Sequence, residues 1–337
     1  MTRKSRRRIA GITLIELMVA MAIGSFLMIG AVTVFMQGRT TFRVNESVSR
    51  LQENARFVLD ALEPEIRMAH YWGLTSRTIK LQGRATPADP TPPGLGVAND
   101  CGLNWSINLG NEVTGTNNNY AWACAAFGGG AQPLADTLEI RRVSEDPVAL
   151  PLAGTMYVQS ARFRDGQIFV GPAVPPGFLA GTSQSHRLIV NGYYVSPNST
   201  LDTPGNPVPS LRVKTLIGGG AAGPRIVDQE VLPGIEDLQV QFGVDTDIDG
   251  TPNRGSIDRY VEPGDPILNP ASPAFIPDAQ ILAVRLWVRV RAERPENGFT
   301  DTTNYVYADQ NVAAPNDAFR RVLVSKTIYV RNARTPT

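Results

Sequence analysis

An apolar run near the N-terminus constrains this sequence more than any other feature. Residues 12–36 contain one ionisable side chain, that of Glu16. A helix of about 20 apolar residues spans the hydrocarbon core of a bilayer, so this run is long enough to cross a membrane. Residues 1–11 carry five basic side chains and no acidic one. The positive-inside rule therefore places them in the cytoplasm and everything after about Gln37 on the opposite side.

A secretory signal peptide is the alternative reading of this segment, because it also has a basic start and an apolar run. The run here is longer than a usual signal core, and no small-x-small cleavage site ends it. Glu16 also places a carboxylate near its start. These features favour a retained membrane helix.

The apolar pattern continues beyond the membrane-spanning length with helical periodicity. Apolar side chains recur every three or four residues, which is typical of one buried helix face, at Val44, Val48, Leu51, Ala55, Val58, Leu62, Ile66 and Ala69. The pattern predicts one helix from about Ile12 to Ala69. Pro64 removes a backbone donor, so we expect a break or kink there.

The remainder of the chain changes to the period of two that is typical of strands. Six alternating segments are the clearest: 138–141, 188–195, 211–215, 238–244, 282–290 and 322–330. We interpret residues 75–133, which are rich in Pro, Gly and Asn, as long surface excursions. We interpret the Arg-rich strand from Arg285 to Arg294 as a solvated sheet face rather than a nucleic-acid track. The predicted fold class is α+β, with the long N-terminal helix packed on an antiparallel β-rich head.

Composition and net charge argue against several classes of function. The 337 residues are 42% hydrophobic and 19% charged, which is enough apolar material for a core. A net charge of +1 argues against a dedicated nucleic-acid binder. His70 and His186 are the only histidines, and no Ser/His/Asp motif accompanies them. We expect no enzyme.

The start of the apolar run has a specific resemblance. The segment from Gly11 to Ala20 reads G-I-T-L-I-E-L-M-V-A, which closely resembles the processing site of type IV prepilins and pseudopilins. The resemblance implies that a prepilin peptidase cuts between Gly11 and Ile12 and that the new N-terminal amine of Ile12 is methylated. The family usually has Phe where this chain has Ile12, and both side chains are bulky and apolar.

Glu16 is the assembly residue that this resemblance implies. A carboxylate within hydrocarbon is costly unless it is paired, and the N-terminal ammonium of a neighbouring subunit could pair with it when helices pack side by side. The alternative is a Glu that is favoured near a helix start by the helix dipole and reaches the membrane interface.

Later segments look like landmarks of PilW-type minor pilins. They include Gln52–Phe57, Tyr71–Gly73, Asp136–Arg142, Gly243–Asp247 and Val330–Asn332. The resemblance implies a basic leader (1–11), a transmembrane and filament-core helix (12–36), an amphipathic continuation (37–70) and a periplasmic head (71–337). It implies an inner-membrane protein that later enters the base or tip of a pilus. The implied partners are other minor pilins, the major pilin, prepilin peptidase and the inner-membrane assembly machinery, with no nucleic acid.

The implied function is to initiate or cap type IV pilus assembly, which supports twitching motility and adhesion. A minor pseudopilin of a type II secretion system shares the same N-terminus and is the nearest alternative. A membrane-tethered periplasmic enzyme and a surface-binding adhesin are further alternatives.

Cys101 and Cys124 are the only cysteines and lie on the non-cytoplasmic side in the predicted orientation. An oxidising compartment favours a disulfide between them, and two free buried thiols are the alternative. Neither a CxxC motif nor a nearby histidine supports a zinc site.

Calcium is the only cofactor for which the sequence offers a candidate site. Asp245, Asp247 and Asp249 alternate before Gly250, as in the first half of a calcium loop. The twelfth position is Ser256 rather than Glu, although Asp258 lies two residues further on. The alternative is an acidic hairpin turn, because Asp and Gly are frequent in turns.

Overall fold

The computed structural model describes residues 12–110, 112–247, 255–277 and 279–333. These residues form two compact units, one ending at Arg50 and the other spanning Leu51–Thr337. Helix α1 (Leu14–Arg67) contributes to both units. This confirms the predicted long helix, and Pro64 does not end it, because the helix continues to Arg67.

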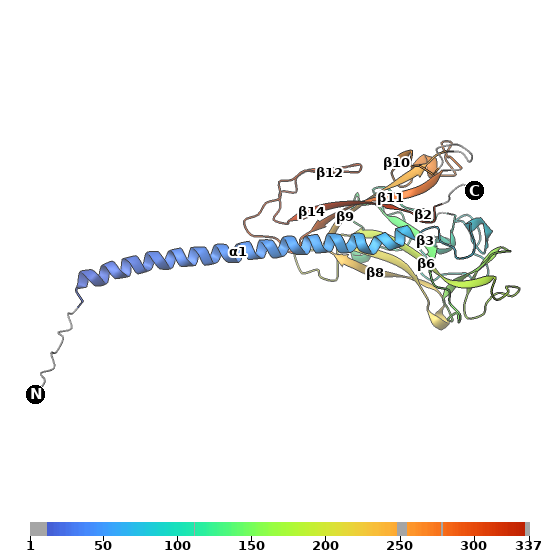
Figure 1. Ribbon diagram of the computed structural model, residues 1–337, viewed down its shortest axis with the longest axis horizontal. Helices are drawn as coiled ribbons and strands as arrows, with labels where there is room; N and C mark the ends of the chain where they lie inside the picture. Colours follow the sequence, from blue (N-terminus) through green and yellow to red (C-terminus); the bar gives the residue numbers. More distant parts are fainter. Residues whose placement is uncertain (1–11, 111, 248–254, 278, 334–337) are drawn as a thin grey trace, which may run out of the picture. The chain divides into compact units, whose positions relative to one another are not determined.

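The second unit is a β-rich head built on three sheets (Figure 1). The largest has eight strands in the order β1-β5-β4-β6-β3-β2, with β7 joined to β6 and β8 to β7. Its strands are β1 (Leu81–Gln82), β2 (Val113–Thr114), β3 (Leu138–Val143), β4 (Met156–Ala161), β5 (Gly166–Val170), β6 (Ser183–Ser196), β7 (Ser210–Ile217) and β8 (Arg225–Pro233). All its strand pairs are antiparallel except β1 with β5, which is parallel.

The second sheet is fully antiparallel and has the order β10-β9-β11-β14. Its strands are β9 (Ile235–Asp245), β10 (Arg259–Val261), β11 (Gln280–Arg291) and β14 (Arg321–Tyr329). A separate hairpin pairs β12 (Tyr305–Tyr307) with β13 (Gln310–Val312). The six predicted strands correspond to β3, β6, β7, β9, β11 and β14.

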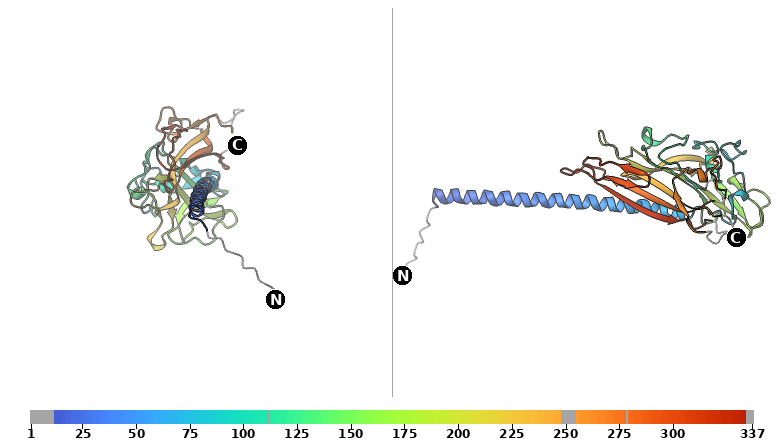
Figure 2. Two further views of the ribbon diagram at one scale, coloured as in Figure 1. Left: turned by 90° about the vertical axis from the view of Figure 1, so that its left-hand side faces the viewer. Right: turned by 90° about the horizontal axis from the view of Figure 1, so that it is seen from above.

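The head part of α1 and both large sheets share one hydrophobic core. Five helix side chains at three- and four-residue steps are buried in it, namely Leu51, Ala55, Val58, Leu62 and Ile66. The same core takes buried side chains from β3, β6, β7, β9 and β11. Figures 1 and 2 show this end of α1 beside both sheets. Each turn of the helix buries an apolar side chain, and this burial stabilises the head.

Polar contacts fix the same helix end on both sheets. Glu63 accepts a hydrogen bond from Lys326 of β14 at 2.5 Å. Two residues along, Glu65 accepts a hydrogen bond from Arg142 of β3 at 2.7 Å and another from Asn191 of β6 at 3.1 Å. These side chains fix the rotation of the helix about its axis.

The interpretation of residues 75–133 as surface excursions is wrong in part. They contain few regular elements, namely β1, β2 and the short 3₁₀ helices Thr78–Lys80, Trp105–Ile107 and Phe127–Gly129. Yet this segment buries Leu95, Trp105, Ile107, Leu109 and Trp122 in a second core with residues of the large sheet. Apolar side chains separated by turn residues carry no periodic signal, so the pattern could not reveal their burial.

The interpretation of the Arg-rich strand as a solvated face is wrong in part, since Arg294 is exposed whereas Arg289 is buried. Arg289 of β11 is 8% exposed and donates to Glu236 at 3.0 Å. Its guanidinium lies 5.5 Å from the ring centroid of Tyr305 on β12, and the Tyr307 hydroxyl donates to buried Asp237 of β9. The segment after β11 therefore covers these charges with aromatic rings, and β9 supplies the carboxylates.

Candidate functional site

The start of α1 is held by a reciprocal pair of hydrogen bonds between Thr13 and Glu16. The backbone N–H and the hydroxyl of Thr13 each donate to Glu16 Oε2 at 2.9 Å, and the Glu16 N–H donates to Thr13 Oγ1 at 3.3 Å. This arrangement is a capping box, which satisfies donors that a helix start leaves unpaired. Within the described residues, Glu16 Oε1 accepts no hydrogen bond. Gly11 lies outside the described residues, and Ile12 is 77% exposed.

The first unit of α1 presents apolar side chains on every face. All residues from 12 to 43 are exposed, and the helix contains a window long and apolar enough to span a membrane. The few hydroxyl groups are satisfied within the helix, because Ser25 and Thr33 donate to the carbonyls of Met21 and Ile29. Internal satisfaction of polar groups is the condition for a helix to lie in hydrocarbon.

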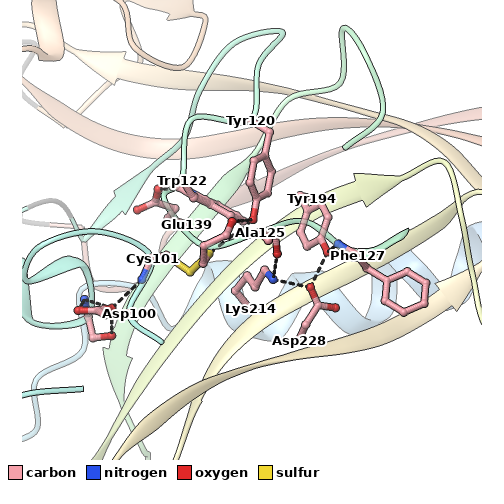
Figure 3. The surroundings of a disulfide bond; sticks show 12 residues. Asp100, Cys101, Tyr120, Trp122, Ala125, Phe127, Glu139, Tyr194, Lys214 and Asp228 are labelled. Carbon is pink, nitrogen blue, oxygen red and sulfur yellow. Dashed lines mark hydrogen bonds and ion pairs between the residues drawn. A yellow bond between two sulfur atoms is a disulfide. The ribbon is translucent and has the colours of Figure 1, made fainter. Parts of the chain in front are cut away.

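Cys101 and Cys124 form a disulfide in the structure, with Cα atoms 4.4 Å apart. The bond joins two parts of the segment that covers the large sheet, and an aromatic cluster surrounds it (Figure 3). Tyr120 lies edge-on to Trp122 and Tyr194, with ring centroids 4.9 and 5.0 Å away. The crosslink therefore holds an irregular segment against the second core.

The acidic turn forms the connection between β9 and β10. Asp245 ends β9, and the Asp258 N–H donates to the Val244 carbonyl at 2.9 Å. Carboxylate oxygens of Asp245, Asp247 and Asp258 lie within 4.8 Å of one another. Asp249 and Gly250 lie outside the described residues. The Asp245 carboxylate accepts backbone N–H groups of Asp247 and Gly255 at 2.9 and 2.6 Å. These bonds are what a hairpin turn requires, and calcium binding stays a prediction.

Asp136 is a buried carboxylate whose connecting role sequence reasoning missed. It is fully buried, and it accepts the Asn118 N–H and the Val240 N–H at 2.8 Å each. It thereby ties a loop of the first sheet to β9 of the second. Burial raises the pKa of Asp136 to about 7, and the charges of Asp309 and Glu262 act in the same direction. An isolated Asp before a strand carries no sequence signal of this role.

Comparisons with known proteins identify two family models that match parts of this chain. The family model described as type IV pilus-assembly protein W matches residues 192–332, from within β6 to just beyond β14. The model described as the prokaryotic N-terminal methylation motif matches residues 6–32. The chain matches none of the curated proteins. Among solved structures, a type IV-like pilin from Thermus thermophilus covers 84% of this chain and 98% of its own, with 13% identity and a TM-score of 0.35.

The two family matches lie at opposite ends of the chain and leave residues 33–191 unmatched. The landmarks at Gly243–Asp247 and Val330–Asn332 fall inside the matched part of the head, whereas Gln52–Phe57 and Asp136–Arg142 fall outside it. The apolar helix and the β-rich head add the expected α+β architecture. The chain thus resembles PilW-type pilins in the second part of its head, and it carries a prepilin-type N-terminal motif.

Proposed function

We propose that this protein is a minor pilin that takes part in initiating or capping type IV pilus assembly, and that it thereby supports twitching motility and adhesion. The observation that carries the proposal is the combination of a PilW match in the head with a methylation motif at the helix start. Its role is structural rather than catalytic. Its partners are other minor pilins, the major pilin and the inner-membrane assembly machinery.

Assembly begins with processing of the N-terminus. Prepilin peptidase cuts between Gly11 and Ile12, which removes the basic leader and creates a methylated ammonium on Ile12. Residues 1–11 stay cytoplasmic before the cut, and the head lies in the periplasm. Within the described residues, the apolar side chains of residues 12–43 are exposed, so their burial requires a partner. Lateral packing against neighbouring helices supplies one, and the subunit can leave the bilayer for the filament.

Glu16 sets the register of this packing. The capping box fixes its side chain through Oε2, and Oε1 is available to accept a hydrogen bond from the ammonium of a neighbouring Ile12. An unpaired carboxylate in an apolar bundle costs several kcal/mol. Helix registers that leave Glu16 unpaired are therefore disfavoured, and one axial position of the new subunit is selected.

A minor pseudopilin of a type II secretion system is the second candidate, because the N-terminal motif serves both systems. The PilW match favours the pilus. The test is a chromosomal deletion scored in parallel for surface pili, for twitching and for secretion of extracellular enzymes, with the wild-type gene restored as control. We expect loss of pili and twitching with normal secretion. Lost secretion with normal pili would move the protein to the secretion system.

A further inference from the structure

A patch that is both apolar and basic lies at one end of the large sheet of the head. Three segments meet there: the 3₁₀ helix Thr78–Lys80, the turn 162–165 between β4 and β5, and the loop 177–182 before β6. Each contributes one large apolar side chain that points to solvent, namely Ile79, Phe163 and Leu179, with 63%, 85% and 72% exposure. We call these three residues, together with the exposed Arg77, Lys80, Arg162 and Arg164, the basic apolar patch.

Several contacts hold the three segments together. Lys80 Nζ lies 3.9 Å from Asp165 Oδ1, which connects the 3₁₀ helix to the turn. Arg164 donates to the Gly177 carbonyl at 2.6 Å and stacks 4.1 Å from the ring centroid of Phe178, which connects the turn to the loop. The Arg162 N–H also donates to the Thr182 carbonyl at 3.1 Å. These contacts therefore hold the three segments of the patch in one fixed arrangement on the head.

The charge of the patch is opposite to the net charge of the chain after residue 11. Five of the 32 basic side chains lie in residues 1–11, so the rest of the chain holds 27 against 31 acidic ones. The patch concentrates four basic side chains, and Asp165 is the acid that contacts them. Exposed apolar side chains gathered in one place mark interaction sites, and the cations select an anionic partner.

We propose that the basic apolar patch binds the surface of a lipid bilayer that contains anionic headgroups. Phe163 would enter the boundary between headgroups and acyl chains, flanked in sequence by Arg162 and Arg164, which would meet the phosphates. Aromatic and aliphatic side chains beside cations are the combination that interfacial membrane binding uses. The proposal does not depend on where in a pilus the head is placed.

Single-stranded nucleic acid is the competing occupant, because it also combines stacking with phosphate contacts. Two observations favour lipid. Ile79 and Leu179 are aliphatic and offer no ring for stacking. Phe178 lies beside the patch, and its ring stacks on Arg164. Phe163 is therefore the one aromatic ring that the patch itself offers to a base.

The test uses the head fragment Leu51–Thr337, because the membrane helix would bind vesicles by itself. Every side chain of both hydrophobic cores lies within this fragment, so it retains the buried contacts of the head. Vesicles of phosphatidylcholine alone and of equal parts phosphatidylcholine and phosphatidylglycerol are sedimented with it. We expect binding to the anionic vesicles, weakened by added salt, and little binding to the zwitterionic ones.

Two pairs of variants separate the patch from the rest of the surface. Phe163→Ser should weaken vesicle binding about tenfold. Val306→Ser removes another exposed apolar side chain (71%) that lies outside the patch, and it should leave vesicle binding unchanged. Arg162→Ala should weaken it about fivefold, and Arg331→Ala, an exposed arginine outside the patch, should not. Thermal unfolding of all four verifies that they fold.

The proposal is overturned if the fragment ignores anionic vesicles or if the control variants lose as much binding as the patch variants. A fluorescent oligothymidine is tested with the same proteins. Binding to it that requires Phe163 and Arg162, without vesicle binding, would assign the patch to nucleic acid instead of lipid.

Discussion

Residues 14–36 and residues 51–67 belong to one uninterrupted helix, but their side chains follow different rules. The first part is apolar on every face and exposed throughout. The second is amphipathic, with Leu51, Val58 and Leu62 buried and charged side chains such as Glu53 and Arg56 exposed. A helix that is apolar on every face is buried by lipid or by other helices outside the subunit. An amphipathic helix buries its apolar face against the core of its own fold. Under the proposed function, the same secondary structure serves assembly in one part and stability in the other.

The largest expected effect comes from making one substitution in both parts. Leu62→Ala removes a fully buried side chain and should lower the free energy of unfolding of the head by about 2–5 kcal/mol. Leu27→Ala changes a side chain that is 69% exposed within the subunit and should leave the free energy of unfolding of the head unchanged. Urea unfolding of the full chain in detergent, followed by tryptophan fluorescence, measures both. Equal losses would mean that the two parts are not independent.

Next in size is the disulfide. Replacing Cys101 and Cys124 by serine together should lower the stability of the head by about 3 kcal/mol, because the crosslink closes a loop with a sequence separation of 23. The aromatic cluster beside it should lose order, which near-ultraviolet circular dichroism reports. Identical masses under reducing and non-reducing conditions in the wild type would refute the bond.

The buried carboxylate Asp136 predicts a smaller, pH-dependent effect. Its pKa is raised from about 3.8 in the unfolded chain to about 7 in the fold, so the folded state binds the proton more tightly. Its contribution to stability is therefore fully present below about pH 4 and is lost as the pH rises through 7. Asp136→Asn should cost about 1–2 kcal/mol less at pH 8 than at pH 5. Urea unfolding at the two pH values measures this, and an equal cost at both would contradict the raised pKa.

Calcium should have the smallest effect. If the acidic turn binds it, millimolar calcium should stabilise the head by about 1 kcal/mol through mass action, and Asp247→Asn should abolish the gain. Calorimetric titration of the head with calcium gives the direct reading. Absence of heat at millimolar concentrations would leave Asp245 and Asp258 as turn residues only.

Periodic segments were predictable from the sequence, and irregular ones were not. The heptad-like spacing from Leu51 to Ile66 identified the buried helix face, and strict alternation identified β9 and β11. β4 and β5 were missed because both are short, and β4 is buried on both faces, so its sequence lacks alternation. The burial of Trp105 and Trp122 depends on a covering segment without periodicity.

The candidate site divides in the same way. The resemblance at the N-terminus pointed to Glu16. Its capping bond to Thr13 was not predicted, although the spacing T-x-x-E is the sequence signature of such a bond. The partners of Arg289 are non-local, since Glu236 and Tyr305 reach it from two other segments. Contacts between residues far apart in the sequence leave no local pattern. The sequence of an Arg-rich strand therefore cannot show that other segments bury its side chains.

The central claim is that Glu16 acts between subunits and not within the head. The most direct measurement is the incorporation of Glu16→Ala into sheared filaments, relative to the wild type and to Glu46→Ala, which removes an exposed carboxylate paired with Arg50 on the same helix. We expect Glu16→Ala to be processed and to stay in the inner membrane with an unchanged head stability, while Glu46→Ala enters filaments normally. Normal incorporation of Glu16→Ala would contradict the account.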